Sequence, residues 1–286
     1  MILLAMLLAL GAERLLSSRR RSGSADPVLA RLWPRLPAAV RHVAGAPWLL
    51  ALAAAAVTAA LAWQLQPALL ELLFSAAVLL ICFGPRDLAD DVQRLRAARS
   101  AGDAATVARL SRVLQLGPMP DADHRSLLGA LFIQSHERRF GACLWFIVLG
   151  PAGAVLYRVA SRLAVLIEDS AAQRQAALLH GLMAWLPARI TALLYGMAGS
   201  MDDALDAFGR VQREPVSGTD GWQRRSWSLL AETANAALDW EDAPDSGPMI
   251  ASSLDATLAE VLRMETRATL ILLALVAMFS AGAWVS

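Results

Sequence analysis

Residues 46–83 read "APWLLALAAAAVTAALAWQLQPALLELLFSAAVLLICF". The run 46–65 carries no charge, and a helix needs about 20 apolar residues to cross the hydrocarbon core of a bilayer. A second apolar run, 68–83, follows a two-residue Gln-Pro connection, and its single charge, Glu71, lies near its start. The stretch therefore predicts two membrane helices joined as a tight hairpin.

The composition points to a membrane protein throughout. Of the 286 residues 57% are hydrophobic and 18% are charged, which is too apolar for a soluble domain of this length. The net charge of +1 creates no basic field, so we expect a lipid bilayer as partner and no nucleic acid. All 26 basic residues are arginine, which excludes the mechanisms that need a lysine, such as a phosphate-binding P-loop or a Schiff base.

Further apolar stretches extend the pattern along the chain. Residues 141–157 and 178–198 are two more membrane blocks, and 268–285 is an uninterrupted C-terminal span. The run 1–16 is short and lacks a signal-peptide pattern, so it is expected to be retained, either as a short span or as a helix embedded from one side. The predicted fold class is an all-α integral membrane protein, a multi-span helical bundle with helical cytoplasmic segments.

Arginine sets the expected orientation. It is concentrated in 17–45, 84–140 and 201–267, and the positive-inside rule places all three regions in the cytoplasm. The blocks 141–157 and 178–198 either both cross the membrane or are both re-entrant. Two crossings and no crossing leave the arginine-rich regions on the same side, so the positive-inside rule cannot decide between these alternatives.

Five consecutive parts follow from this pattern. They are an N-terminal apolar helix plus membrane hairpin over 1–83 (helices 46–65 and 68–83), a cytoplasmic helical lobe over 84–140, two membrane-embedded or spanning blocks with a polar niche over 141–200, a cytoplasmic helical segment over 201–267 and a C-terminal transmembrane helix over 268–286.

Capping residues and periodicity predict helices inside the polar parts. Asp103 follows Gly102 and can cap a helix with one apolar face. That face is expected to comprise Val107, Leu110, Val113 and Leu114. A further helix is expected to start at Asp121 or Asp123 and run to the membrane, and two more cover 202–213 and 226–240, with a break at "EDAPDSGP" after them.

The stretch "LPARITALLYGM", 186–197, carries a helix breaker and a permanent cation inside an apolar block. An arginine at membrane depth is costly unless it faces a partner, a cavity or a ligand, and a proline break needs cover by protein or water. Pro187, Arg189 and Thr191 therefore predict a polar niche that binds an anionic ligand. The alternative is that Arg189 extends to the membrane interface from an embedded block.

A second stretch, "LGPAGAVLYR", 149–158, also combines a predicted helix break with an arginine. Gly150 and Gly153 weaken the helix, and Tyr157 and Arg158 follow at its end. A break that exposes amide groups beside an arginine suits an anionic ligand, whereas close helix packing explains the glycines equally well.

The densest polar cluster is "QSHERRF", 134–140, just before a membrane block. It is either a solvated face next to the membrane or, through Glu137 and its arginines, the mouth of the niche. Glu13, at the end of the first apolar run, is a candidate countercharge for Arg189. Two separated cysteines and four scattered histidines show no ligand spacing, so neither a metal nor a cofactor is expected, and no catalytic residue is identified.

The order of these motifs resembles the AmpE family of bacterial inner-membrane proteins over essentially the whole chain. It runs from "ERLL" through a charged helical lobe, "FGACLWFIVLGPAGAVLYRVASRL" and "WLPARITALLYGM" to a terminal span, and "GPAGAVLYR" and "LPARITALL" are its most specific pieces. AmpE proteins are in turn similar to the CbiB/CobD adenosylcobinamide-phosphate synthases, which share the Pro-Ala-Arg and Gly-Pro-x-Gly-Ala motifs. The chain lacks the synthases' Glu-Ser, Glu-Asn and Asp-Gly residues before "LWFIVLG" and their Asn-Thr-Leu-Asp after Arg158. These are the acids expected to hold Mg²⁺.

The resemblance implies a role beside the amidase AmpD, in signalling that links cell-wall recycling to β-lactamase induction. The leading hypothesis is a non-enzymatic sensor or accessory protein of the inner membrane whose niche binds a muropeptide, phosphate or lipid headgroup. The alternatives are a CbiB/CobD-like membrane ligase with a modified active site and, more remotely, a transporter.

Overall fold

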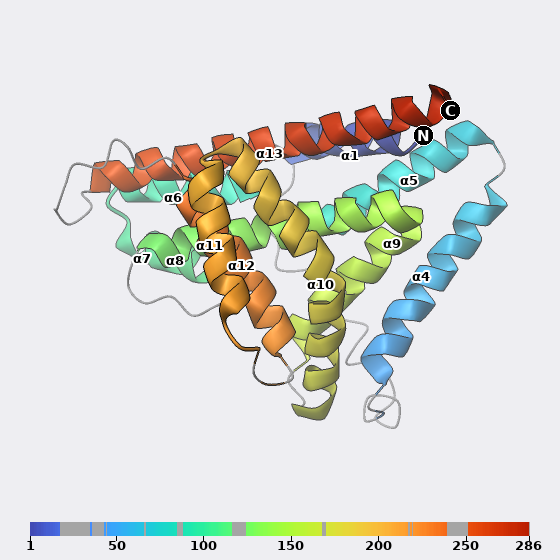
Figure 1. Ribbon diagram of the computed structural model, residues 1–286, viewed down its shortest axis with the longest axis horizontal. Helices are drawn as coiled ribbons and strands as arrows, with labels where there is room; N and C mark the ends of the chain where they lie inside the picture. The colour runs from blue at the N-terminus through green and yellow to red at the C-terminus, as the bar shows by residue number, and fades with distance from the viewer. Residues whose placement is uncertain are drawn as a thin grey trace. The chain divides into compact units, whose positions relative to one another are not determined.

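Every regular element of the part of the chain that the structure describes is a helix (Figure 1). The computed structural model describes residues 1–17, 35, 43, 45–65, 67–84, 88–115, 124–167, 170–216, 218, 220–238 and 251–285. The expected helix start at Asp121 or Asp123 and the break "EDAPDSGP" lie outside these residues. The helices fall into two compact units: unit 1 contains residues 1–87, 137–187 and 216–223, and unit 2 contains 88–136, 188–215 and 224–286.

Unit 1 is built around α9. Its helices are α1 (Ile2–Ser17), α4 (Ala46–Gln64), α5 (Ala68–Phe83), α9 (Gly141–Leu166) and the first part of α10 (Ser170–Ala198). The predicted pair 46–65 and 68–83 is present with nearly those ends. Helix α4 packs mainly on α9, α5 packs equally on α9 and α1, and α4 and α5 touch each other little. The link between α4 and α5 is as short as expected for a hairpin, but the two helices pack against α9 much more than against each other.

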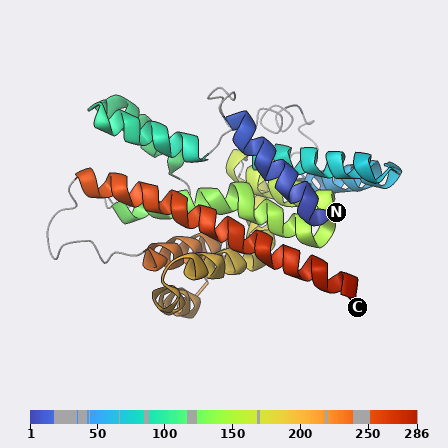
Figure 2. The same ribbon diagram turned by 90° about the horizontal axis from the view of Figure 1, so that it is seen from above.

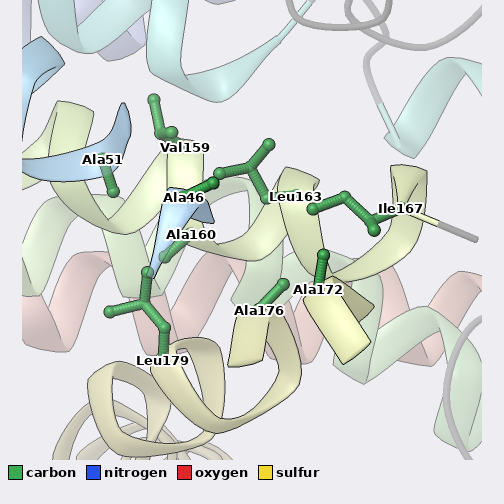
Figure 3. Close-up of a cluster of buried hydrophobic side chains, with 9 residues drawn as sticks. All are labelled: Ala46, Ala51, Val159, Ala160, Leu163, Ile167, Ala172, Ala176 and Leu179. Atoms are coloured by element: carbon green, nitrogen blue, oxygen red, sulfur yellow. The ribbon is translucent and has the colours of Figure 1, made fainter. Parts of the chain in front are cut away.

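Small side chains let the helices of unit 1 approach closely. Ala46 and Ala51 of α4 meet Ala160 of α9, and Ala172 and Ala176 of α10 join the same cluster (Figure 3). Larger side chains of α9 and α10 fill the remaining space, namely Val159, Leu163, Ile167 and Leu179. Alanine-rich contacts are typical of membrane helices, where association depends on close van der Waals packing.

Unit 2 contains α6 (Leu88–Ser100), α7 (Ala104–Leu114), α8 (His124–Ser135), the last part of α10, α11 (Met201–Arg213), α12 (Gly221–Ala237) apart from its first three residues, which belong to unit 1, and α13 (Ala251–Val285). Helices α6 and α7 lie side by side (Figure 2), and α6, α7 and α13 all pack on α8. An ion pair between Arg99 and Asp255, 3.3 Å apart, links α6 to α13.

The predicted cap of α7 is confirmed. Asp103 Oδ1 accepts from the backbone amide of Thr106 at 3.0 Å, and hydrogen bonds from Thr106 lower the pKa of Asp103 below its ordinary value of 3.8. The predicted apolar face is only partly right. Leu110 and Leu114 are buried, whereas Val113 is 37% exposed, because it lies about 100° around the helix from Leu114.

The end of α10 packs against α11 and α12. Ala192 meets Val211 of α11 and Leu229 of α12 in one apolar cluster. A Cβ on Gly196 would come within 3.0 Å of the Ala204 Cβ, and the amide of Ser200, just after the helix, donates to the carbonyl of Ala237 at 2.9 Å. These contacts hold the three helix segments in a fixed arrangement within unit 2.

Among the described residues, five stretches are long and apolar enough to cross a membrane: Ala46–Gln64, Ala68–Ser100, Leu127–Leu166, Ala171–Ala198 and Leu254–Ala281. The prediction of an all-α, multi-span membrane protein is therefore confirmed. The third stretch begins before the predicted block 141–157, because α8 continues into α9 through a short π-helix, η1 (His136–Phe140). The division into five parts by membrane side stays a prediction.

Candidate functional site

Two clusters of polar side chains among the described residues contain the predicted site residues Glu137, Tyr157 and Arg189, one cluster in each unit. The carboxylate–imidazole cluster of unit 1 consists of Glu137, Tyr157, His180 and Gln223. The arginine cluster of unit 2 consists of Arg189, Gln212 and Arg225.

The π-helical turn η1 carries the polar sequence "QSHERRF" into the interior. The four consecutive residues from Gln134 to Glu137 are all buried, with at most 7% of each side chain exposed. Successive helical residues point about 100° apart, so a run of four buried side chains means that the helix is covered on every side. A solvated face is therefore wrong for this part of the motif. Short π-helical turns are frequent at functional sites.

Glu137 is the centre of the carboxylate–imidazole cluster. Its Oε2 atom accepts a hydrogen bond from the Tyr157 hydroxyl at 3.1 Å and lies 2.9 Å from Nε2 of His180. The Glu137 side chain is 6% exposed and that of His180 is 1% exposed. A carboxylate buried this deeply needs such donors, since an unsatisfied one is very costly.

The contact on Nδ1, the other ring nitrogen of His180, indicates the tautomer of the imidazole. Nε2 of Gln223 lies 2.7 Å from Nδ1 of His180. An amide nitrogen only donates, so Nδ1 must accept, and the imidazole proton lies on Nε2 and points to Glu137. His180 is thus arranged to donate to the carboxylate of Glu137.

Gly141, at the start of α9, makes room for this network. A Cβ there would overlap the ring of Tyr157 and come within 2.5 Å of its hydroxyl. The residue types of the cluster are those of general acid–base chemistry. Their hydrogen bonds to one another also hold η1, α9, α10 and the start of α12 together.

The arginine cluster forms where α10, α11 and α12 meet in unit 2. Nη2 of Arg189 donates to Oε1 of Gln212 at 3.1 Å, and Nη2 of Arg225 donates to the backbone carbonyl of the same glutamine at 2.6 Å. Arg189 is half-buried, two residues after Pro187. The partner seen on its Nη2 is a neutral amide, so the positive charge is positioned without being neutralised by that contact.

Thr191, predicted in the same niche, has a partner from another helix segment. Its Oγ1 lies 3.0 Å from Nδ1 of the buried His136, and one turn later the Tyr195 hydroxyl donates to the carbonyl of Phe132 at 3.3 Å. The Tyr195 and Phe132 rings also contact each other, with centroids 4.9 Å apart. Thr191 therefore helps to tie α8 and η1 to α10.

The predicted break in α9 is real. Gly150 has φ 63° and ψ −153°, a left-handed conformation that glycine adopts at little cost, and Pro151 follows without an amide hydrogen. At Gly153 a Cβ would come within 2.7 Å of the Leu149 side chain and would meet the carbonyl of Trp145. Gly153 therefore has the close-packing role, because the kinked preceding turn occupies its space.

The remaining predicted residues lie in unit 1. Glu13 forms an ion pair with Arg139 at 3.2 Å, so the cation seen beside it is not the one expected from the sequence. Arg158 is 5% exposed, beside Tyr157 in α9. Within the described residues no group of three or more His, Cys, Asp or Glu side chains is arranged to hold a metal ion.

Comparison with known proteins adds the family. Residues 1–281 match the family described as regulatory signalling modulator protein AmpE. The chain belongs to the AmpE family. It is a multi-span membrane protein of that family, and no solved structure matches it.

The chain is also similar to a cobalamin biosynthesis protein. It is 29% identical over 209 residues to "Cobalamin biosynthesis protein CobD" of Chromobacterium violaceum, a match that covers 68% of this chain and 57% of that protein. The chain thus matches little more than half the length of its curated relative. The distant relation to CobD proteins expected from the motifs is confirmed.

The sequence anticipated some members of each cluster and missed others. Glu137, Tyr157 and Arg189 were predicted as site residues, and each lies in one of the two clusters. The structure adds the partners His180, Gln212, Gln223 and Arg225. Only His180 carried a signal, as a histidine within an apolar stretch, because the others reach their clusters through tertiary packing.

Proposed function

We propose that this AmpE-family protein is a sensor or accessory protein of the bacterial inner membrane that acts without catalysis. It works in the signalling that links cell-wall recycling to β-lactamase induction, in functional connection with the amidase AmpD. Its ligand is an anion held at Arg189: a muropeptide, a phosphate or a lipid headgroup. The family's description as a regulatory signalling modulator supports the signalling role.

The observation that carries the proposal is the setting of Arg189. It lies in a helix apolar enough to cross a membrane, yet it is only half-buried, and Gln212 orients it by its amide oxygen. A permanent cation at such a position is retained where it meets a partner or a ligand. The hydrogen bond from Nη2 to the amide oxygen of Gln212 fixes the direction of the guanidinium.

The proposed orientation puts 17–45, 84–140 and 201–267 in the cytoplasm. Arginine enrichment in these regions supports it through the positive-inside rule. The apolar stretch Leu127–Leu166 begins inside the second region, so the proposed cytoplasmic part of that region ends before Leu127. Single cysteines at the exposed positions 103 and 214 test the orientation, with a membrane-impermeant thiol reagent added to intact right-side-out vesicles or to opened ones. The proposed orientation predicts labelling only after the vesicles are opened, and labelling of intact vesicles would refute it. Cys82 and Cys143 are buried, and serine replacements supply the background.

The ligand proposal is tested by thermal stability. Full-length protein in detergent is melted with muropeptides, anionic phospholipids and Mg²⁺–nucleotides, and Arg189→Ala is compared with wild type. Binding to the folded state raises the melting temperature by mass action, by about 2.7 kcal/mol of stabilisation at one hundred times Kd. A shift with a muropeptide or an anionic phospholipid that disappears in Arg189→Ala supports the proposal, and the absence of any shift in wild type refutes it.

The second candidate function is a membrane ligase with a modified active site. Similarity to CobD favours it, as does the buried acid, imidazole and phenol of the carboxylate–imidazole cluster. A ligase or ATPase of this kind is stabilised by Mg²⁺–ATP, whereas the sensor is not. A nucleotide-dependent shift lost in Glu137→Gln or Arg189→Ala would establish the enzyme and overturn the sensor.

A further inference from the structure

Arg225 occupies a defined place beside Arg189 in unit 2. It lies in the first turns of α12, and its Nη2 atom donates to the carbonyls of Gln212 at 2.6 Å, of Val211 at 3.4 Å and of Glu214. These carbonyls end α11, where the helix dipole is negative and a cation is stabilised. The guanidinium of Arg225 is therefore anchored along one edge.

Gln212 brings the two arginines to one place. Its side-chain oxygen receives Arg189 and its backbone oxygen receives Arg225. The packing of Ala192 against Val211 and Leu229 fixes the three helix segments that carry these residues. Both guanidiniums contact Gln212, so two positive charges are held near each other. Keeping two like charges together costs free energy that an anion between them would recover.

Arg225 also retains an unused donor. Its Nε atom is buried and has no hydrogen-bond acceptor among the described residues. Buried donors normally have partners, so an exception in a native structure calls for an explanation such as a bound ion or ligand. The cap on α11 uses Nη2 and does not account for Nε.

We infer that Arg225 is the second arm of the anion site, and that the Arg189–Arg225 pair recognises a phosphate-type dianion in preference to a carboxylate. This inference rests on the proposed function and names the chemical class of its ligand. Gln212 places one nitrogen of each guanidinium, so two positive charges meet at one residue, and Arg225 adds its buried Nε atom as a further donor. A tetrahedral phosphate presents three oxygens in three directions and up to two negative charges, whereas a carboxylate presents two oxygens in one plane and a single charge.

Phosphate can come from a lipid headgroup or from solution, and the experiment separates the sources. Full-length protein in phosphatidylcholine nanodiscs is titrated with inorganic phosphate, pyrophosphate and acetate at constant ionic strength and followed by thermal stability and calorimetry. A parallel series uses nanodiscs that contain phosphatidic acid. The variants are Arg225→Lys, which keeps the charge but lacks Nε, Arg225→Ala, Arg189→Ala and, as a matched control, Arg224→Ala at the exposed neighbouring position.

The inference predicts that phosphate or phosphatidic acid stabilises wild type and Arg224→Ala, and binds at least tenfold more tightly than acetate. Arg225→Lys and Arg189→Ala should each weaken that binding at least tenfold. The melting temperature without ligand reports the helix cap separately, so a variant that only loses the cap melts lower yet binds phosphate as wild type does.

The possible failures are distinguishable. Wild-type phosphate affinity in Arg225→Lys and Arg225→Ala, with loss in Arg189→Ala, would overturn the role of Arg225 and leave the proposed function standing. Acetate binding as tight as phosphate binding would overturn the ligand class. The absence of phosphate and phosphatidic acid binding to wild type would overturn the inference, and the proposed function would be overturned only if muropeptides also failed to stabilise wild type.

Discussion

Replacement of His180 by leucine should destabilise the protein through two separate losses. Leucine removes the donor to Glu137 and the acceptor for Gln223, at positions where the native distances are 2.9 Å and 2.7 Å. Each buried polar group left without its partner costs about 1–3 kcal/mol, and a carboxylate lies at the upper end. We therefore expect His180→Leu to lower the free energy of unfolding by about 2–6 kcal/mol.

A matched variant tests whether hydrogen bonding is the cause. In His180→Gln the amide nitrogen can donate to Glu137 while its oxygen accepts from Gln223, so the same side chain restores both contacts. Tyr157→Phe removes only one of the two hydrogen bonds to Glu137 and should cost about 1–3 kcal/mol. The expected order of stability is wild type, then His180→Gln, then Tyr157→Phe, with His180→Leu lowest.

Thermal unfolding in detergent, followed by the fluorescence of the nine tryptophans, measures these differences. For chains of this size 1 kcal/mol corresponds to about 2–4 °C, so His180→Leu should melt at least about 4 °C below wild type. Equal melting of His180→Leu and His180→Gln, or a loss below about 1 kcal/mol in His180→Leu, would refute the description of the cluster as a hydrogen-bonded network.

Two further predictions concern packing and helix capping. The new methyl group of Gly141→Ala should overlap the ring of Tyr157, at a cost of about 1–3 kcal/mol beyond the roughly 1 kcal/mol that alanine gains over glycine in a helix. Gly11→Ala has nothing within 4 Å of its Cβ and should raise the melting temperature, so equal shifts in the two variants would contradict this packing. Because hydrogen bonds from Thr106 lower the pKa of Asp103 in the folded state, the cap should stabilise α7 above pH 3.8, the ordinary pKa, and weaken as pH falls through the lower folded value. Amide hydrogen exchange of α7 should show this acid dependence in wild type and lose it in Asp103→Asn, and identical profiles would contradict the assignment.

The membrane helices and several local features could be read from the sequence because short-range chemistry determines them. A charge-free stretch as long as 46–65 has few alternatives to a membrane helix. The break at Gly150 and the cap at Asp103 follow from the backbone freedom of glycine and the side-chain oxygen of aspartate.

The clusters depend on tertiary structure and could not be read in full. Gln212 is 23 residues from Arg189 in the sequence, and His180 is 43 residues from both Glu137 and Gln223. The π-helical turn changes which side chains of "QSHERRF" face inward, and helical periodicity does not encode such an insertion. A dense run of charge next to a membrane block resembles a solvated face until the helices that cover it are known.

The central claim is that Arg189 holds an anionic ligand. Its most direct test is the dissociation constant of wild type and Arg189→Ala for phosphate, a muropeptide and an anionic phospholipid, measured by calorimetry on full-length protein in nanodiscs. The account predicts that at least one of these binds wild type and binds Arg189→Ala at least tenfold more weakly, a difference of about 1.4 kcal/mol. Equal affinities in the two proteins, or no binding of any of the three ligands to wild type, would contradict it.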